Sequence, residues 1–380
     1  MRARRASMLF LLLFIMGTVL FATSGLVHAL PAGFQEFYLP LPTGDNRASP
    51  PFNGTYSIFN AIEPPITASR GMHYVVGVTA SSDNTAVYYD HWENGLGTGP
   101  SGDEVVYLSK GQVHYFESAS IPVPRGTNTY YDGGDRIFVS GSLLQLVVST
   151  WTEHQGTVFS DAWEIYPRQA WEAAYTIPVG QDLASPPRNY RDFTYVYAVI
   201  MSGSDNNAIQ IRNAAGTLLA STTLNRGKTY IYQVLTAGTT VSGSAPVQVQ
   251  LMTGRRDTSG WEMRGYTMMP QSFWGNSYWA PVPSWRNANT DVFLYNPNSA
   301  AITVSFEDLA GSGSFSIPPR QTLNYRTGAG RYVPQNSGVH LSSTSTFWGI
   351  ILVKVQKLHF HAETQRTQSL MPRASSGISP

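Results

Sequence analysis

The chain has 380 residues, of which 13% are charged and 12% aromatic, and it contains 34 glycines, 24 prolines and no cysteine. Its formal net charge of +1 gives no electrostatic basis for binding nucleic acid or an anionic membrane. The absence of cysteine excludes disulfides, thiol nucleophiles, zinc ribbons and iron–sulfur clusters, so stability has to come from packed apolar cores.

Residues 1–29 have the three parts of a secretory signal peptide. "MRARR" is positively charged, Met8–Leu20 is almost unbroken apolar sequence, and "VHA" supplies small residues ahead of Leu30. We expect cleavage after Ala29 and a secreted or cell-surface mature chain that does not insert into the membrane; an uncleaved anchor is the alternative. Three of the 25 basic residues lie in this segment, so the mature chain carries a net charge of about −2.

The sequence after the signal favours β-strands over helices. The segments with the strongest strand pattern are rich in β-branched and aromatic residues, or alternate polar with apolar ones, and are bounded by Gly, Asn and Pro. They are "TYVYAVIM", "AIQIRN", "TYIYQVL" and "VQVQLM". This pattern predicts an all-β fold.

The chain repeats itself at an interval of about 100 residues. "VSGS" occurs at 139–142 and again at 241–244, and each copy precedes an alternating strand. A second set recurs with a shift of 103: Pro167, Trp171, Tyr175 and Pro178-Val179 match Pro270, Trp274, Tyr278 and Pro281-Val282. Further echoes are "NTAVYYD", "NNAIQIRN" and "AAITVSF", and then "LSKGQ", "LNRGK" and "IPPRQTL".

Three tandem modules account for these repeats. Each has roughly six to eight predicted short strands, the inventory of an antiparallel β-sandwich, whereas propeller blades recur at about 40 to 50 residues. We expect a signal peptide at 1–29, module one at 30–174, module two at 175–277, module three at 278–355 and a disordered tail at 356–380. Module three lacks a Trp-Glu segment after its last strand, so it is either incomplete or diverged.

Module one adds polar residues where the other modules have short turns. Its insertions are "DHWENGLGTGPSGDE", at the end of a strand, "IPVPRGTNTYYDGGD" and "TEHQGTVFSDAWE". Loops that leave the same end of a sandwich cluster, so we expect these insertions to meet on one surface at the rim of the sheet. The candidate ligand-binding residues are Asp90, His91, Trp92, Glu93, Arg125, Asp132, Asp135, Glu153, His154 and Asp161.

A calcium ion is one interpretation of these carboxylates, because calcium takes six to eight oxygen ligands. The site would comprise Asp90, Glu93, Asp132 and Asp135, although their spacing is not that of an EF-hand. A transition metal held by His91 and His154 is less favoured, because no two histidines stand at ligand spacing. No other cofactor is predicted.

Catalysis and turn formation are two further interpretations. A secreted hydrolase acting on polysaccharide would use Asp90, Glu93 and Asp132 as its acids. Turn chemistry needs the same residue types, because Asp and Asn bond their own backbone and Gly permits positive φ. The sequence has no G-x-S-x-G motif and "VSGS" recurs, so its serines are assigned to turns.

Nine tryptophans and 21 tyrosines also supply aromatic faces on which a sugar could stack. The aromatic residues that repeat with the modules are assigned to the cores: Trp171, Trp274, Tyr175 and Tyr278. Three tryptophans do not repeat cleanly and are kept as contact candidates: Trp92, Trp151 and Trp285.

The stretches "YYDHWENG", "VPRGTNTYYDGGDRI", "DAWEIYP" and "YTIPVG" resemble a segment near the N-terminus of large bacterial surface proteins, which often continue into immunoglobulin-like arrays. The order of "TASSDNTAVYY", "LSKGQ" and "VSGSAPVQV" is similar to the N-terminal region of IgGFc-binding-type proteins. The resemblance runs from about Phe34 to Val355 and implies secretion, surface display and adhesion. It brings no catalytic residues with it.

These features predict an exported, non-enzymatic binding or adhesion protein built from β-sandwich repeats. Its expected partner is an extracellular protein or carbohydrate, contacted by the module-one loops. The alternatives are the polysaccharide hydrolase and a structural component of the cell envelope.

Overall fold

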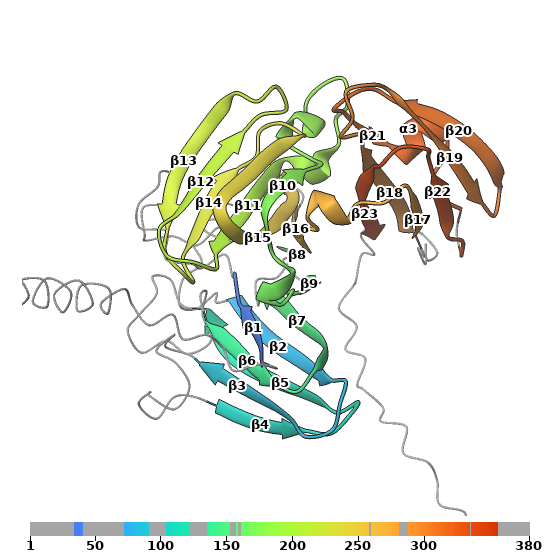
Figure 1. Cartoon of the computed structure of the whole chain (residues 1–380). Helices are drawn as coiled ribbons and strands as arrows, with labels where there is room; N and C mark the ends of the chain where they lie inside the picture. Colours follow the sequence, from blue (N-terminus) through green and yellow to red (C-terminus); the bar gives the residue numbers. More distant parts are fainter. Residues whose placement is uncertain are drawn as a thin grey trace, which may run out of the picture. The chain divides into compact units, whose positions relative to one another are not determined.

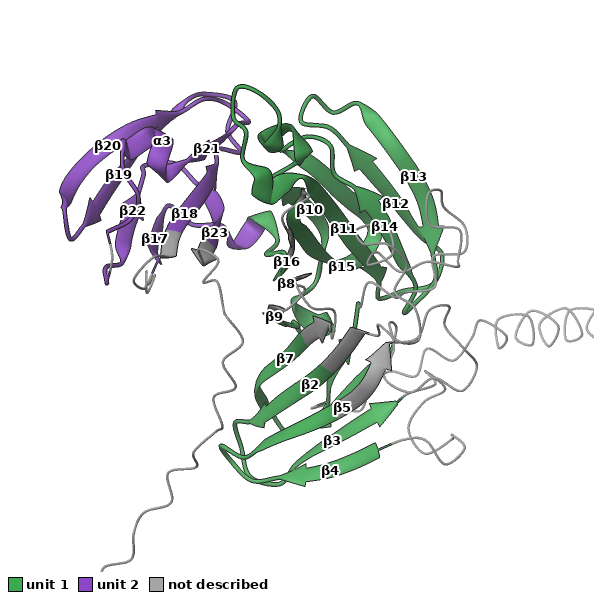
Figure 2. Cartoon of the chain, turned by 180° about the vertical axis from the view of Figure 1, so that it is seen from behind, with its two compact units in different colours: residues 1–271 green, residues 272–380 purple. Residues whose placement is uncertain are grey.

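The computed structural model describes residues 34–40, 72–90, 104–121, 135–152, 157–158, 161–257, 260–280, 288–334 and 336–355. These residues form mainly antiparallel sheets joined by turns and short helices, which confirms the predicted all-β fold (Figure 1). The chain divides into two compact units, Met1–Gln271 and Ser272–Pro380 (Figure 2). In the described residues, no helix has the length and apolar character needed to span a membrane.

The first group of strands forms two four-stranded sheets, ordered β1-β6-β3-β4 and β5-β2-β7-β9. Apolar side chains of both sheets, among them Val87, Phe116 and Val148, belong to one buried core. The strands are β1 (Phe34–Tyr38), β2 (Met72–Ala80), β3 (Thr85–Asp90), β4 (Glu104–Leu108), β5 (Val113–Ile121), β6 (Arg136–Ser140), β7 (Leu143–Thr152) and β9 (Asp161–Glu164).

The second group is organised around one long strand, β15 (Thr239–Asp257), which pairs with β10 and β12 through its first part and with β11 and β16 mainly through its second part. All of β11 is buried, and its Tyr197 and Val199 join the core of the first group. The other strands are β8 (Thr157–Val158), β10 (Glu172–Ile177), β11 (Tyr195–Ser202), β12 (Asn207–Arg212), β13 (Leu218–Leu224), β14 (Thr229–Gln233) and β16 (Gly260–Thr267). Short 3-10 helices are η1 (Arg168–Ala170), η2 (Gln181–Ala184) and η3 (Arg191–Phe193).

The second unit contains sheets ordered β17-β22-β19-β20 and β21-β18-β23. Its helix α3 (Tyr325–Ala329) begins where the Asn324 side chain accepts the Arg326 N–H and ends at Gly330, whose φ is +72°. The strands are β17 (Ser277–Ala280), β18 (Ala288–Tyr295), β19 (Ile302–Asp308), β20 (Gly311–Ile317), β21 (Thr322–Asn324), β22 (Val339–Ser342) and β23 (Trp348–Val355), after η4 (Gln271–Phe273).

The three groups share one pairing scheme. In each group the last paired segment, called the late strand, is either one long strand, β15, or two consecutive strands, β6–β7 and β22–β23. The first and third strands of the group pair with the first half of this late strand, in the triplets β1-β6-β3, β10-β15-β12 and β17-β22-β19. The second strand of the group pairs with the fifth strand and with the second half of the late strand, in β5-β2-β7, β14-β11-β15 and β21-β18-β23. The sequence repeat therefore corresponds to a repeated sheet topology.

The turn after the second strand is repeated down to its backbone conformation. Asn84 and Asn206 have φ values of 57° and 54°, in the left-handed region that asparagine tolerates better than most residues. In the facing turn, which connects the fourth and fifth strands of each group (residues 109–112 and 225–228), Gly111 and Gly227 have φ values of 79° and 72°. The echoes "LSKGQ" and "LNRGK" are therefore the same turn.

An aspartate ties these two turns together in the first and second groups. Asp83 Oδ1 accepts the backbone N–H of Lys110 at 2.9 Å, and Asp205 Oδ1 accepts that of Arg226 at 3.1 Å. In the second unit the facing turn "IPPRQTL" places Arg320 at φ 53°, where the other groups have glycine. The weakest of the sequence echoes therefore also marks the equivalent turn.

The two "VSGS" copies lie in equivalent strands but not at equivalent positions. Val139 lies opposite Val87, whereas Val241 lies opposite Ile211 and Ile209 lies opposite Gly243. Val87 and Ile209 each stand three residues after the left-handed asparagine, so the second copy is displaced by two residues along the ladder.

The repeated aromatic residues belong to the interior, as predicted. Trp171 and Trp274 are 5% and 6% exposed. Tyr175 is buried, and its hydroxyl donates to the Val247 carbonyl at 2.8 Å; the half-buried Tyr278 donates to the Phe347 carbonyl at the same distance.

We expect Asp83→Ala and Asp205→Ala each to lower the free energy of unfolding by about 1 kcal/mol, because each removes a hydrogen bond that joins two turns. Asparagine keeps the acceptor oxygen, so the Asn variants should stay close to the parent chain. Urea denaturation of the four variants tests this. A large loss from only one of the two alanine variants would contradict the equivalence of the turns.

Candidate functional site

The structure describes three of the ten candidate residues of module one. Asp90 ends β3, Asp135 directly precedes β6, and Asp161 begins β9 opposite Thr150. Asp90 and Asp135 are both 0% exposed, so neither carboxylate faces solvent. The other candidates lie outside the described residues: His91, Trp92, Glu93, Arg125, Asp132, Glu153 and His154.

Across the described part of the chain, no group of three His, Asp or Glu side chains is placed to hold a metal ion. Two of the four predicted calcium ligands, Glu93 and Asp132, are not among the described residues. The calcium site therefore stays a prediction.

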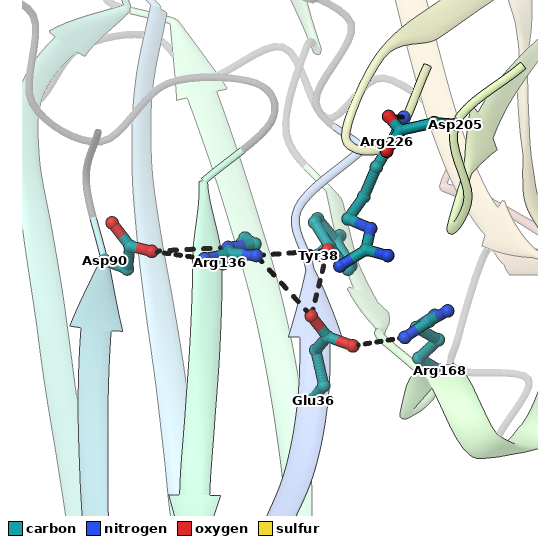
Figure 3. Close-up of polar contacts among 7 residues, drawn as sticks. All are labelled: Glu36, Tyr38, Asp90, Arg136, Arg168, Asp205 and Arg226. Atoms are coloured by element: carbon teal, nitrogen blue, oxygen red, sulfur yellow. Dashed lines mark hydrogen bonds and ion pairs between the residues drawn. The ribbon is translucent and has the colours of Figure 1, made fainter. Parts of the chain in front are cut away.

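Asp90 belongs to a row of side chains on the three adjacent strands β1, β6 and β3. The register pairs Tyr38 with Arg136 and Arg136 with Asp90. Arg136 donates to Asp90 Oδ2 through Nη2 at 2.9 Å and through Nε at 3.3 Å (Figure 3). The alternate residues Phe37 and Ile137 belong to the core, so the row lies on the outer face of the sheet.

Glu36 completes this ionic network from the same face of β1. Its side chain is 2% exposed and accepts the Tyr38 hydroxyl and Arg168 Nη1, both at 2.9 Å. Arg136 also lies near Glu36, with 3.8 Å between Arg136 Nη1 and Glu36 Oε1. Both buried carboxylates are therefore compensated by arginine.

The protonation states suit this arrangement. Burial, followed by the charge of Glu36, raises the pKa of Tyr38 to about 12, so the phenol is a neutral donor at physiological pH. Burial opposes the charge of Arg136, but its hydrogen bonds to Tyr38 and Asp90 and the charge of Asp90 raise its pKa above the ordinary value. Arg136 is thus a permanent cation.

Asp135 has a separate structural contact. Its Oδ2 accepts the Tyr89 hydroxyl at 2.9 Å, and its backbone carbonyl accepts the Leu39 N–H at 3.0 Å. Because Tyr89 is in β3 and Leu39 follows β1, Asp135 links the strands on both sides of β6.

The ionic network lies where the first strand group meets the second. The Tyr38 ring packs on Trp171 at a centroid distance of 5.8 Å and belongs to a small apolar cluster with Met201. Gln248 Nε2 donates to the Tyr38 carbonyl at 3.3 Å. Figure 3 also shows the Arg226 guanidinium directed toward Tyr38 and Arg168. These contacts define a structural joint within the first unit.

Sequence reasoning missed four members of this network: Glu36, Tyr38, Arg136 and Arg168. The available signal was the alternation in "FQEFYL", where Glu36 and Tyr38 share the face opposite Phe37 and Leu39. A glutamate inside such an apolar strand needs a cation, but its partner Arg168 is 132 residues away.

The same row of positions occurs in all three strand groups. Each row begins with the first-strand residue that stands two places before a proline. This residue is paired with one residue of the late strand, which is paired on its other side with one residue of the third strand. The rows are Tyr38–Arg136–Asp90, Thr176–Thr240–Arg212 and Trp279–His340–Glu307. The first and third rows both consist of an aromatic residue, a basic residue and a carboxylate.

In the second unit this row is open to solvent. Trp279 is 75% exposed and stacks on His340, with ring centroids 4.2 Å apart and planes 13° from parallel. Ser277 Oγ lies 2.9 Å from His340 Nε2 and holds the imidazole in place. We call this the Trp–His pair.

A hollow of about 390 Å³ lies beside the Trp–His pair on the outer face of β22, β19 and β20. Phe306 and Gly313 are among the residues that line it. Its walls carry short hydroxyl side chains together with one imidazole and one carboxylate: Ser305, Glu307, Ser312, Ser314, His340 and Ser342. Small serine side chains between larger neighbours explain the depression.

The exposed tryptophan is not one that the sequence analysis singled out. Trp151 lies in β7 opposite His73, whereas Trp92 and Trp285 are outside the described residues. Trp279 follows the repeated Tyr278, and strand alternation turns the two side chains to opposite faces. That alternation was the available signal.

Comparisons with known proteins give little further information. No family model and no curated protein matches the chain. A solved "Biofilm associated protein - BSP domain" is similar at 9% identity and a TM-score of 0.15, over 74% of this chain and 58% of that one. The chain thus spans 58% of that structure's length, and a TM-score this low carries no argument about fold or function.

We expect Arg136→Met to lower the free energy of unfolding by about 3–5 kcal/mol, because it removes both arginine hydrogen bonds from the buried carboxylate of Asp90, whereas Glu36 keeps Arg168. Arg188→Met is the matched control: it breaks an ion pair whose side chains are 31% and 36% exposed, so about 1 kcal/mol or less is expected. Chemical denaturation measures both. Equal effects would show that the ionic network is not needed for the joint.

A carboxylate in the second unit makes stability depend on pH. Asp308 accepts hydrogen bonds from Arg331 Nη2 at 2.8 Å, the Tyr325 hydroxyl at 2.7 Å and the Ala310 N–H at 2.9 Å. Burial alone would raise the pKa of Asp308, but these hydrogen bonds and the charge of Arg331 lower it below the ordinary value.

Because the folded-state pKa of Asp308 is lowered, its stabilising effect is present above the unfolded-state pKa of about 3.9 and is lost as pH falls through the folded-state value. We expect Asp308→Asn to melt below the parent chain at pH 7, with the gap closing below about pH 4. Thermal melts across this range test it. A gap independent of pH would contradict an ionic role.

Proposed function

We propose that this chain is a non-enzymatic extracellular or cell-surface binding protein of the adhesion type. Repeated β-sandwich groups provide the scaffold, and the outer face of β17, β22, β19 and β20 holds the ligand. The observation that carries this proposal is the Trp–His pair, because a tryptophan 75% exposed beside a formed hollow is a ready contact surface.

The burial of Asp90 and its bonds to Arg136 support binding over hydrolysis. A general acid or nucleophile has to reach its substrate, whereas Asp90 is fully buried and bonded twice to Arg136. The remaining acids of the hydrolase interpretation, Glu93 and Asp132, keep their predicted role as loop contacts. Asp90 acts instead as part of the joint.

The partner class is an extracellular protein or carbohydrate, consistent with a net charge close to zero. Export follows from the predicted signal peptide at 1–29. The resemblance to the N-terminal region of IgGFc-binding-type proteins makes immunoglobulin Fc one specific ligand to test.

Binding of the full chain to a defined panel tests the proposal. The panel holds immunoglobulin Fc, a matrix glycoprotein with and without its glycans, and neutral and acidic polysaccharides, measured by biolayer interferometry. We expect at least one ligand to bind and Trp279→Ala to weaken it about tenfold, equivalent to 1.4 kcal/mol.

Leu309→Ala is the matched control, because Leu309 is 76% exposed in the same unit, in the β19–β20 turn, and is not among the residues that line the hollow. It should leave binding unchanged. Lack of binding to the whole panel, or equal binding by both variants, would overturn the proposal. Release of reducing ends from a polysaccharide would favour the hydrolase.

A further inference from the structure

We propose that the hollow beside the Trp–His pair binds a short stretch of a neutral oligosaccharide. This inference rests on the proposed function and adds the class of ligand. In this arrangement the imidazole wall packs against a sugar ring, while the serines and Glu307 bond its hydroxyl groups.

The hydrogen-bonding groups of the hollow suit a polyhydroxylated ligand. Each serine hydroxyl both donates and accepts, as a sugar hydroxyl does. Two rows of them run across the sheet, since the register places Ser305 opposite both Ser342 and Ser314, and Glu307 opposite Ser312. Neighbouring strands lie about 4.8 Å apart, so these rows present hydrogen-bonding groups at regular intervals.

The Trp–His pair makes one wall of the hollow rigid. His340 lines the hollow, Trp279 stacks on its far side at 4.2 Å, and Ser277 bonds its Nε2 at 2.9 Å. A side chain already fixed in this way loses little conformational freedom when a ligand packs on it. An aromatic face offers the apolar surface that the C–H side of a sugar ring needs.

Charge restricts the ligand to neutral sugars. Glu307 is an exposed carboxylate on the hollow, and neither lysine nor arginine is among the residues that line it. A sulfated, phosphorylated or uronic acid ligand would meet the like charge of Glu307, with no lysine or arginine on the hollow to offset it. A neutral sugar hydroxyl can instead donate a charge-assisted hydrogen bond to Glu307.

The same surface is poorly suited to a protein partner. Protein interfaces are depleted in serine and glutamate, and their binding energy comes from aromatic or arginine anchors at the centre of the contact. Here four of the six named wall residues are serines. The tryptophan belongs to the edge strand β17 and not to the centre of the face.

Saturation-transfer NMR on the full chain tests the proposal with cellohexaose, maltohexaose and mannohexaose as neutral probes and polygalacturonate as the acidic probe. We expect at least one neutral probe to bind and polygalacturonate not to bind. Trp279→Ala and Glu307→Gln should each weaken binding about tenfold. Trp279→Phe, which keeps an aromatic ring against His340, should stay within about threefold of the parent chain. Leu309→Ala should have no effect, and thermal melts confirm that every variant folds.

The outcomes separate this inference from the proposed function. Binding of Fc or of the deglycosylated matrix protein that depends on Trp279, without binding of any neutral probe, overturns the inference and leaves the proposed function standing. Preference for polygalacturonate overturns the inference on charge. Neutral binding that survives Trp279→Ala and Glu307→Gln overturns the assignment to this hollow. Failure of every ligand to bind overturns both.

Discussion

The joint in the first unit depends on two buried carboxylates that are paired with arginine, Asp90 with Arg136 and Glu36 with Arg168, and Arg136 lies between them. Asp90 and Glu36 are 0% and 2% exposed, and burying either carboxylate without compensation would cost several kcal/mol. The guanidinium meets this requirement because it keeps its charge at all physiological pH values and projects donors in a planar fork. Arg136 is in β6, between β3 and β1. It bonds Asp90 on β3 and lies beside Tyr38 and Glu36 on β1. With these charges compensated, Tyr38 can pack its ring on Trp171 and close the joint to the second strand group.

The repeated topology has a local physical basis. In the first group and in the second unit, two consecutive strands, β6–β7 and β22–β23, lie in different sheets, whereas β15 of the second group pairs with both sets of strands within a single eight-stranded sheet. β15 is a continuous strand of 19 residues, whereas β6 and β7 are separated at Gly141, whose φ is +108°. A side chain at Gly141 would also meet Thr85 Oγ1 at 2.9 Å, so glycine is needed there for space as well as conformation. The same connection is thus made with a break in one group and without one in another.

Much of the fold could be predicted from residues whose role is local. Alternation, the Asn-containing turns and the recurring Trp171 and Trp274 identify strands, turns and core without knowledge of the pairing. The candidate site was less accessible, because its residues meet through strand register. Asp90 and Arg136 are 46 residues apart, and their pairing follows from the order β1-β6-β3-β4, which no local signal specifies. The "VSGS" repeat illustrates this limit, since identical letters in equivalent strands lie two positions apart along the ladder.

The three equivalent rows indicate how one backbone arrangement serves two purposes. In Tyr38–Arg136–Asp90 the carboxylate is fully buried and needs a permanent cation, while Tyr38 packs against the second strand group and becomes part of the joint. In Trp279–His340–Glu307 the same positions face solvent. There a carboxylate needs no buried partner, because water solvates it, and a weaker base can take the arginine position. The aromatic residue at the first position then keeps an exposed ring instead of losing it to packing. Burial of the row, more than its residue types, therefore decides whether it joins strand groups or remains available to a ligand.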